Sequence, residues 1–440
     1  MEQRRSIHHN IWQIAWPAIL SNISTPLLGL VDTALLGHLD STRYLAAVAI
    51  GASILSFLYW GFGFLRMGTT GLVARATGAK DRERELAVVL QSGILGVMLA
   101  ALVLISQGLW LPVGLRLMNP AAELSMLTQA YVSIRVYSAP AVLVTYAITG
   151  WFIGRQNTRW PMLILISTNV LNIVLDVVFI AVLDGKSEGA AYATLIAEYA
   201  GCALALALAV TKLDWTPLPT VRKQLGKVSS YASLLRSNQY LFVRTVSLLL
   251  AFAFFTAMST RQGETTLAAN TVMLNLLMLA AFALDGFAFA AEGLAGNAAG
   301  ARDLDRFYAA VRACWVWTLI TAVALSLALL AAGPWLYPLF TDHTAVLAGI
   351  HRHQGWLILL PLVAAPSYLL DGVFIGTDRS RYMMKGMVIS VCLIYLPAWY
   401  LSRGLENDGL WLAFTLFNGS RGATLAWYFL RLKQSEGWLD

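Results

Sequence analysis

Charged residues are scarce in this sequence, and their scarcity limits the kind of protein that it can encode. Only 12% of the 440 residues are Asp, Glu, Lys or Arg, whereas 58% are hydrophobic. A soluble globular chain carries about 25% charged residues. At half that proportion the polar surface is too small for a soluble domain of this length, and the composition suits hydrocarbon as the solvent.

Cysteines are few, and the motifs of common soluble enzymes are absent. Cys202, Cys314 and Cys392 all lie in apolar runs without a CxxC spacing or a Cys/His cluster, so we expect core residues and no disulfide framework. The sequence contains no Walker A, GxSxG or HExxH motif. We therefore predict that the chain is not an enzyme, needs no cofactor and does not use ATP itself.

Long apolar segments make up most of the chain. A bilayer span needs about 20 apolar residues, and segments of that length lie near 11–38, 45–77, 86–114, 122–150, 160–184, 189–211, 233–258, 267–298, 307–340, 347–376, 383–402 and 408–431. They are rich in Leu and Ala and lack the alternation of a β-barrel, which indicates helices. The sequence thus predicts an all-α membrane protein of about twelve transmembrane helices.

The two halves of the chain repeat each other. A gapless shift of 222 positions superposes LAA (45–47) on 267–269, GAKD (78–81) on GARD (300–303), and FIG (152–154) on 374–376. We predict an N-terminal lobe over 1–212, a cytoplasmic linker over 213–232 and a C-terminal lobe over 233–440. Because each unit has six spans, both copies enter the membrane from the same side.

The distribution of Lys and Arg predicts how the chain lies in the membrane. Of the 31 basic residues, 19 fall in the connections on one side and 6 on the other. The positive-inside rule then places both termini in the cytoplasm of a multi-pass inner-membrane protein. The net charge of +7 forms no basic stripe, which argues against nucleic acid as a partner.

Ionisable residues within the predicted spans of the first half are candidates for function, because they are costly there. Asp32 follows Pro17 and Pro26, two residues that favour a bend in the first helix. Asn172 and Asp176 are four residues apart and share one helix face. This pair, with Thr194 on the next helix, could coordinate Na⁺ or share a proton. The alternative is a polar contact between helices.

The second half has its own candidates. Asp285 and Glu292 are seven residues apart on one face, and Tyr368 and Asp371 are three apart. Arg244 is an intramembrane cation that we expect to pair with one of these acids, either for function or as a structural ion pair. Arg66 and Arg135 lie near predicted helix ends, where we expect them to snorkel to the interface.

Several patches spread over both halves carry a family resemblance: PLLGLVDTALLGHLDS (26–41), FLRMGTTGL (64–72), NIVLDV (172–177), GAAYATLIAEYA (189–200), ALDGFA (283–288), GARD (300–303) and YLLDGVFIG (368–376). By these patches the chain resembles the multidrug and toxic compound extrusion (MATE) family, in its DNA-damage-inducible protein F branch. The resemblance implies a V of two six-helix lobes with alternating access.

The resemblance also implies a function and a site. Family members export amphiphilic or cationic small molecules in exchange for H⁺ or Na⁺, and this branch favours H⁺. The implied cation site consists of Asp32, Asn172, Asp176, Thr194 and Tyr131. Asp285 and Asp371 correspond to acids that other branches use. We expect a monomer in the lipid bilayer, with no metal other than Na⁺ at Asp32, Asn172 and Asp176.

Two other functions are open at this point. A flippase for lipid-linked precursors is an alternative within the broader superfamily, although such flippases tend to have a more basic cavity and extra helices. A membrane enzyme or a receptor-like scaffold is the second alternative. An enzyme would require a catalytic constellation, and the sequence offers none that can be assembled.

Overall fold

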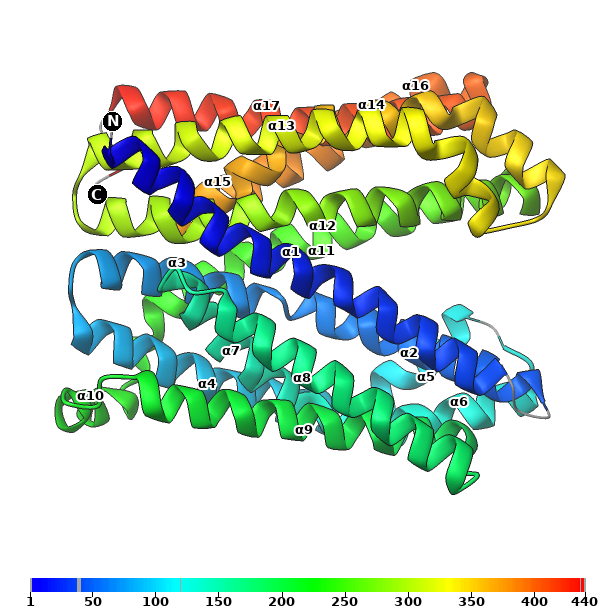
Figure 1. Cartoon of the computed structure of the whole chain (residues 1–440), viewed down its shortest axis with the longest axis horizontal. Helices are drawn as coiled ribbons and strands as arrows, with labels where there is room; N and C mark the ends of the chain where they lie inside the picture. The colour runs from blue at the N-terminus through cyan, green and yellow to red at the C-terminus, as the bar shows by residue number, and fades with distance from the viewer. Residues whose placement is uncertain (1, 38–40, 119, 436, 439–440) are drawn as a thin grey trace.

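The computed structural model describes the chain except residues 1, 38–40, 119, 436, 439 and 440 (Figure 1). In α1, the side chains of residues 2–6, Leu27, Leu30 and Asp32 are also outside the described part. The helices are α1 (Glu2–Gly37), α2 (Thr42–Gly61), α3 (Phe64–Gly78), α4 (Arg82–Ile105), α5 (Gln107–Met118), α6 (Ala122–Arg135), α7 (Ala139–Gly154), α8 (Arg159–Asp176), α9 (Lys186–Lys212), α10 (Leu218–Leu225), α11 (Ala232–Arg261), α12 (Glu264–Gly300), α13 (Leu304–Leu336), α14 (Thr344–Gly376), α15 (Ser380–Ile389), α16 (Leu396–Ser402) and α17 (Glu406–Gln434).

Twelve passes account for these helices, as the sequence predicts. In the described chain, 10 helical segments are long and apolar enough to cross a membrane. One of them, Ser380–Gln434, reverses direction after α16, where Glu406 adopts φ 53°, and therefore holds two antiparallel passes. The 36-residue α1 is the remaining pass.

The repeat seen in the sequence is also present in the helix boundaries. The helices α3 and α12 end at Gly78 and Gly300, and α4 and α13 begin after Asp81 and Asp303. Each aspartate is an N-cap whose carboxylate accepts a backbone N–H three residues later, at 2.9 Å. The 222-residue shift therefore superposes structurally equivalent turns of the two halves.

The two halves form two groups of helices (Figure 1). The first contains α2 to α9 and the second contains α12 to α17, while α1 crosses from one group to the other and packs on both α8 and α12. Pro17 and Pro26 lie inside α1, which continues through them as helix. The bend that we expect at these prolines stays a prediction, as do the lobe boundaries at 1–212 and 233–440.

The lobes meet closely at the end of the molecule that holds both termini (Figure 1), here called the terminal end. A Cβ atom placed on Gly78 would lie 2.0 Å from the carbonyl oxygen of Asn297, and one on Gly300 would lie 2.1 Å from that of Arg75. These two contacts are equivalent under the repeat. Because only glycine fits at either position, α3 and α12 cross backbone against backbone.

Candidate functional site

A buried amide–carboxylate pair lies on α8 in the N-terminal lobe. Asn172 and Asp176 are 1% and 0% exposed, and Asn172 Nδ2 donates a hydrogen bond of 2.8 Å to Asp176 Oδ2. The other amide atom, Asn172 Oδ1, is buried without a hydrogen-bond partner among the described residues. A buried polar atom without a partner is costly, which marks this position as one that a ligand or proton can satisfy.

Thr194 lies at the level of this pair on the neighbouring helix. The antiparallel α8 and α9 touch where Gly201 faces Thr168 and where Gly189 faces Phe179. This register places Thr194 opposite the turn that holds Asn172 and Asp176. Its hydroxyl donates to the carbonyl of Ala190 at 2.9 Å, a bond within its own helix.

Tyr131 is buried in the same lobe but has other described neighbours. A Cβ atom on Gly51 of α2 would lie 2.5 Å from its ring, and its hydroxyl is hydrogen-bonded to Arg135. Arg135 also contacts Glu198 of α9 at 3.8 Å. The described contacts thus join Tyr131 to an Arg–Glu pair. Asp32 is in the helical part of α1, and its side chain lies outside the described residues.

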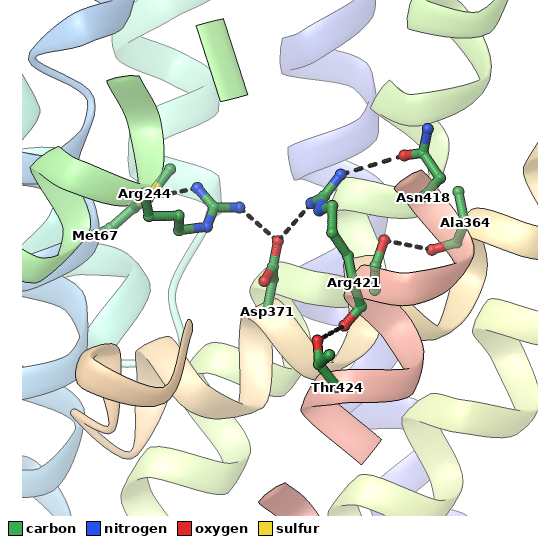
Figure 2. A network of polar contacts seen from close by, with 8 residues as sticks. Met67, Arg244, Ala364, Asp371, Asn418, Arg421 and Thr424 are labelled. Carbon is green, nitrogen blue, oxygen red and sulfur yellow. Dashed lines mark hydrogen bonds and ion pairs between the residues drawn. The ribbon is translucent and has the colours of Figure 1, made fainter. Parts of the chain in front are cut away.

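The C-terminal lobe holds two arginines on one carboxylate (Figure 2). Asp371 Oδ2 accepts hydrogen bonds from Arg244 Nη2 and, at 2.9 Å, from Arg421 Nη2. All three side chains are buried, and Arg421 Nη1 donates a further bond of 3.2 Å to Asn418 Oδ1. Because two guanidinium groups share one carboxylate, this triad carries a surplus positive charge.

A second buried ion pair joins the two lobes. Arg66 of α3 donates to Glu292 of α12 at 3.2 Å, and its guanidinium lies 4.6 Å from the ring centre of Phe289. The expectation that Arg66 snorkels is wrong, because the segment Thr42–Gly78 is interrupted at Phe62 and Gly63 and Arg66 lies well inside it. The break turns an apparent helix end into an interior position.

Asp285 and Tyr368 complete this central cluster. Electrostatic interactions link Asp285 to Arg66, Arg244 and two acids, and link Tyr368 to the same Arg–Asp–Arg triad. Neither side chain has a hydrogen bond or ion pair within the described part of the chain. With every group ionised, the charge on Asp285 balances the surplus of the triad, so protonation of Asp285 would leave the cluster positive.

One member of the cluster is absent from our sequence analysis. Arg421 lies in NGSRGATLAW, inside the predicted span 408–431, and an arginine within a span is itself a signal. The predicted pairing of Arg244 with an acid is confirmed, and the acid is Asp371. Where the structure describes the chain, no group of three or more His, Cys, Asp or Glu is arranged to hold a metal ion.

Comparisons with known proteins agree with the repeat and the fold. The MatE family model matches the chain twice, over residues 17–178 and 241–401. The chain is 36% identical to DNA damage-inducible protein F of Escherichia coli K12, covering 97% of this chain and 93% of that protein. It is 28% identical to DETOXIFICATION 44, a chloroplastic protein of Arabidopsis thaliana, covering 95% and 81%. A crystal structure of a mutant of the Vibrio cholerae MATE transporter VcmN superposes over 100% of both chains, with a TM-score of 0.88 at 20% identity.

Proposed function

Since the chain belongs to the MatE family of membrane transporters, we propose that it is a cation-coupled antiporter. It exports small organic cations, drugs or amphiphilic metabolites by alternating access, and acts as a monomer with both termini in the cytoplasm. The coupling site lies in the N-terminal lobe and comprises Asp32, Asn172, Asp176 and Thr194, with Tyr131 beside it.

The observation that carries this proposal is the Asn172–Asp176 pair. A fully buried carboxylate costs free energy in a bilayer unless a cation neutralises it. Arg135, the cation described in this lobe's polar cluster, contacts Glu198 instead. A mobile cation that neutralises Asp176 therefore stabilises one conformation more than another, and such a difference is what drives exchange.

The geometry favours H⁺ over Na⁺ as that cation. Na⁺ seeks several oxygen ligands, whereas a proton needs one carboxylate. Asn172 directs its NH₂ group, a donor, towards Asp176, so the amide offers no ligand oxygen at that contact. Neutralisation of Asp176 by a proton leaves this hydrogen bond in place.

The C-terminal lobe contributes to cargo recognition in this proposal. Glu292 and Asp371 are held by arginines, which leaves Asp285 as the acid able to attract a cationic cargo. Tyr368 is an aromatic neighbour of that position. Cargo cation and proton would compete for Asp285, whereas Arg244 is fixed by its pair with Asp371.

A flippase for lipid-linked precursors is the second candidate, because more arginines lie in the membrane interior than the sequence alone suggests. Three of the four, Arg66, Arg135 and Arg244, have an acidic partner of their own or share one. The cluster as a whole is balanced rather than strongly basic, and this balance favours export of cations.

Transport into everted membrane vesicles tests the proposal. We expect uptake of a fluorescent organic cation when only a pH gradient is imposed, and none when only a Na⁺ gradient is imposed. Uptake driven by Na⁺ alone would reverse the assignment of the ion. Uptake of equal rate without any gradient would contradict antiport, and selective movement of an anionic lipid-linked sugar would favour the flippase.

A further inference from the structure

A groove on the outer face of the C-terminal lobe combines an apolar lining with two cations. It has a volume of about 370 Å³ and lies between α13 and α17, which both pack on α14. Its floor includes Leu369 and Leu370, and its walls include Trp315 and Phe429. Trp315 and Leu430 are exposed beside it, as expected for side chains that face lipid.

Arg312 and Lys433 line one part of this groove without an acidic partner. No acid contributes to the lining, and among the described residues Arg312 has no hydrogen bond or ion pair. Lys433 lies 5.3 Å from the ring centre of Tyr308, which is also in the lining. An arginine on a transmembrane helix is costly without a partner, so this arrangement calls for an anion from outside the protein.

Both cations lie towards the terminal end of the molecule. Arg312 is eight residues into α13, about 12 Å along its axis from Leu304, and helical side chains lean towards the start of their helix. Lys433 is in the last turn of α17. The two cations therefore lie near the membrane boundary, and the apolar part of the groove continues from them towards the bilayer centre.

We propose that this groove is a binding site for an anionic phospholipid of the leaflet at the terminal end. The phosphate group binds between Arg312 and Lys433, and an acyl chain lies in the apolar groove against Trp315 and Phe429. Basic pockets between transmembrane helices recognise lipid headgroups in this way. The charge, the apolar lining and the position at the boundary all match that ligand.

The internal repeat provides a comparison within the same molecule. Under the 222-residue shift, Leu90 and Thr211 take the places of Arg312 and Lys433 in the N-terminal lobe. The fold therefore does not require a cation at either position. The pair is specific to the C-terminal lobe, which fits a lipid that binds one lobe only.

Native mass spectrometry of the full-length protein, delipidated in detergent and titrated with phosphatidylglycerol, tests this site. We expect Arg312→Gln combined with Lys433→Gln to weaken binding roughly 10- to 30-fold, because each basic residue near a lipid surface contributes on that scale. The matched control, Arg222→Gln with Lys223→Gln on the exposed α10, makes the same change in net charge and should bind as the wild type does.

Two further measurements separate the ligand classes. Ala426→Trp fills the groove without changing charge and should also weaken phosphatidylglycerol binding. Phosphatidylcholine should bind more weakly than phosphatidylglycerol, and inorganic phosphate should not compete. Equal binding of the two lipids, competition by phosphate, or an equal loss in the control variant would overturn the proposal.

Discussion

Four carboxylates in the membrane interior have different partners, and this difference separates their roles. Asp371 is shared by two arginines and Glu292 is paired with one, so both are neutralised by the protein itself. Asp176 accepts a neutral amide N–H, and Asp285 has no ion pair among the described residues. The last two acids are therefore the ones that a mobile cation can neutralise.

The role of Asp176 is tested by Asp176→Asn. The variant keeps the shape and the hydrogen bond from Asn172 but cannot exchange a proton, so we expect coupled efflux to fall to background while the protein stays inserted. Efflux of a fluorescent cation from cells measures the effect. Asp184→Asn is the matched control, because Asp184 is exposed and its φ of 50° suits asparagine. Normal efflux in Asp176→Asn would remove this residue from coupling.

The Arg–Asp–Arg triad makes an unequal pair of predictions. Asp371→Asn leaves two adjacent buried arginines without a counter-charge and should lower stability by roughly 3–5 kcal/mol. Arg421→Gln removes the surplus charge and keeps the pair between Arg244 and Asp371, so it should cost clearly less. Thermal unfolding in detergent compares the two variants. An equal or larger loss in Arg421→Gln would show that the surplus charge is compensated elsewhere.

Single residues could be predicted from the sequence as far as their type and spacing allow. The helical spacing of Asn172 and Asp176 predicts their contact, and the structure confirms it at 2.8 Å. The partner of Arg244 could not be chosen from the sequence, because several acids lie on neighbouring helices and only packing brings Asp371 to it. The proposed coupling role of these residues is a separate question that stays a prediction.

At the scale of the helices, hydropathy predicts where spans lie but not where they break. The predicted span 45–77 corresponds to α2 and α3, which are separated at Phe62 and Gly63. The equally long span 267–298 is a single helix of 37 residues. Both are rich in apolar residues, and the local geometry that divides one of them depends on contacts with other helices.

The crossing of α3 and α12 is the element that we expect to open when the lobes move. Gly78→Val places side-chain atoms against the carbonyl of Asn297 and should cost about 1–3 kcal/mol in this packed position, which lowers the population of the closed form roughly tenfold. A cysteine at Ala74, buried against Gly296, reports on opening by its alkylation rate in a Cys392→Ser background.

The control for this crossing is Gly93→Ala, since a Cβ atom at Gly93 meets no atom within 4 Å. That variant should leave the alkylation rate of the cysteine at position 74 unchanged. The equivalent contact in the other repeat, between Gly300 and Arg75, predicts the same effect for Gly300→Val. An alkylation rate unaffected by both valine variants would show that the crossing does not govern access.

At the scale of the whole molecule, the polar groups of the two lobes differ although the helices repeat. The first lobe has an amide–carboxylate pair on α8, and the second has an arginine cluster around Asp371. The pair between Arg66 and Glu292 links the lobes. A cation bound in one lobe can therefore alter cargo affinity at the centre only by changing how the lobes pack.

Competition between proton and cargo is the central claim, and proton release on cargo binding tests it most directly. The purified protein is mixed with an organic cation in weakly buffered detergent solution, and a pH indicator records protons released as the cargo binds. We expect release from the wild type and a reduced or absent signal from Asp176→Asn at the same extent of binding. Saturating cargo binding without proton release from the wild type would contradict the account.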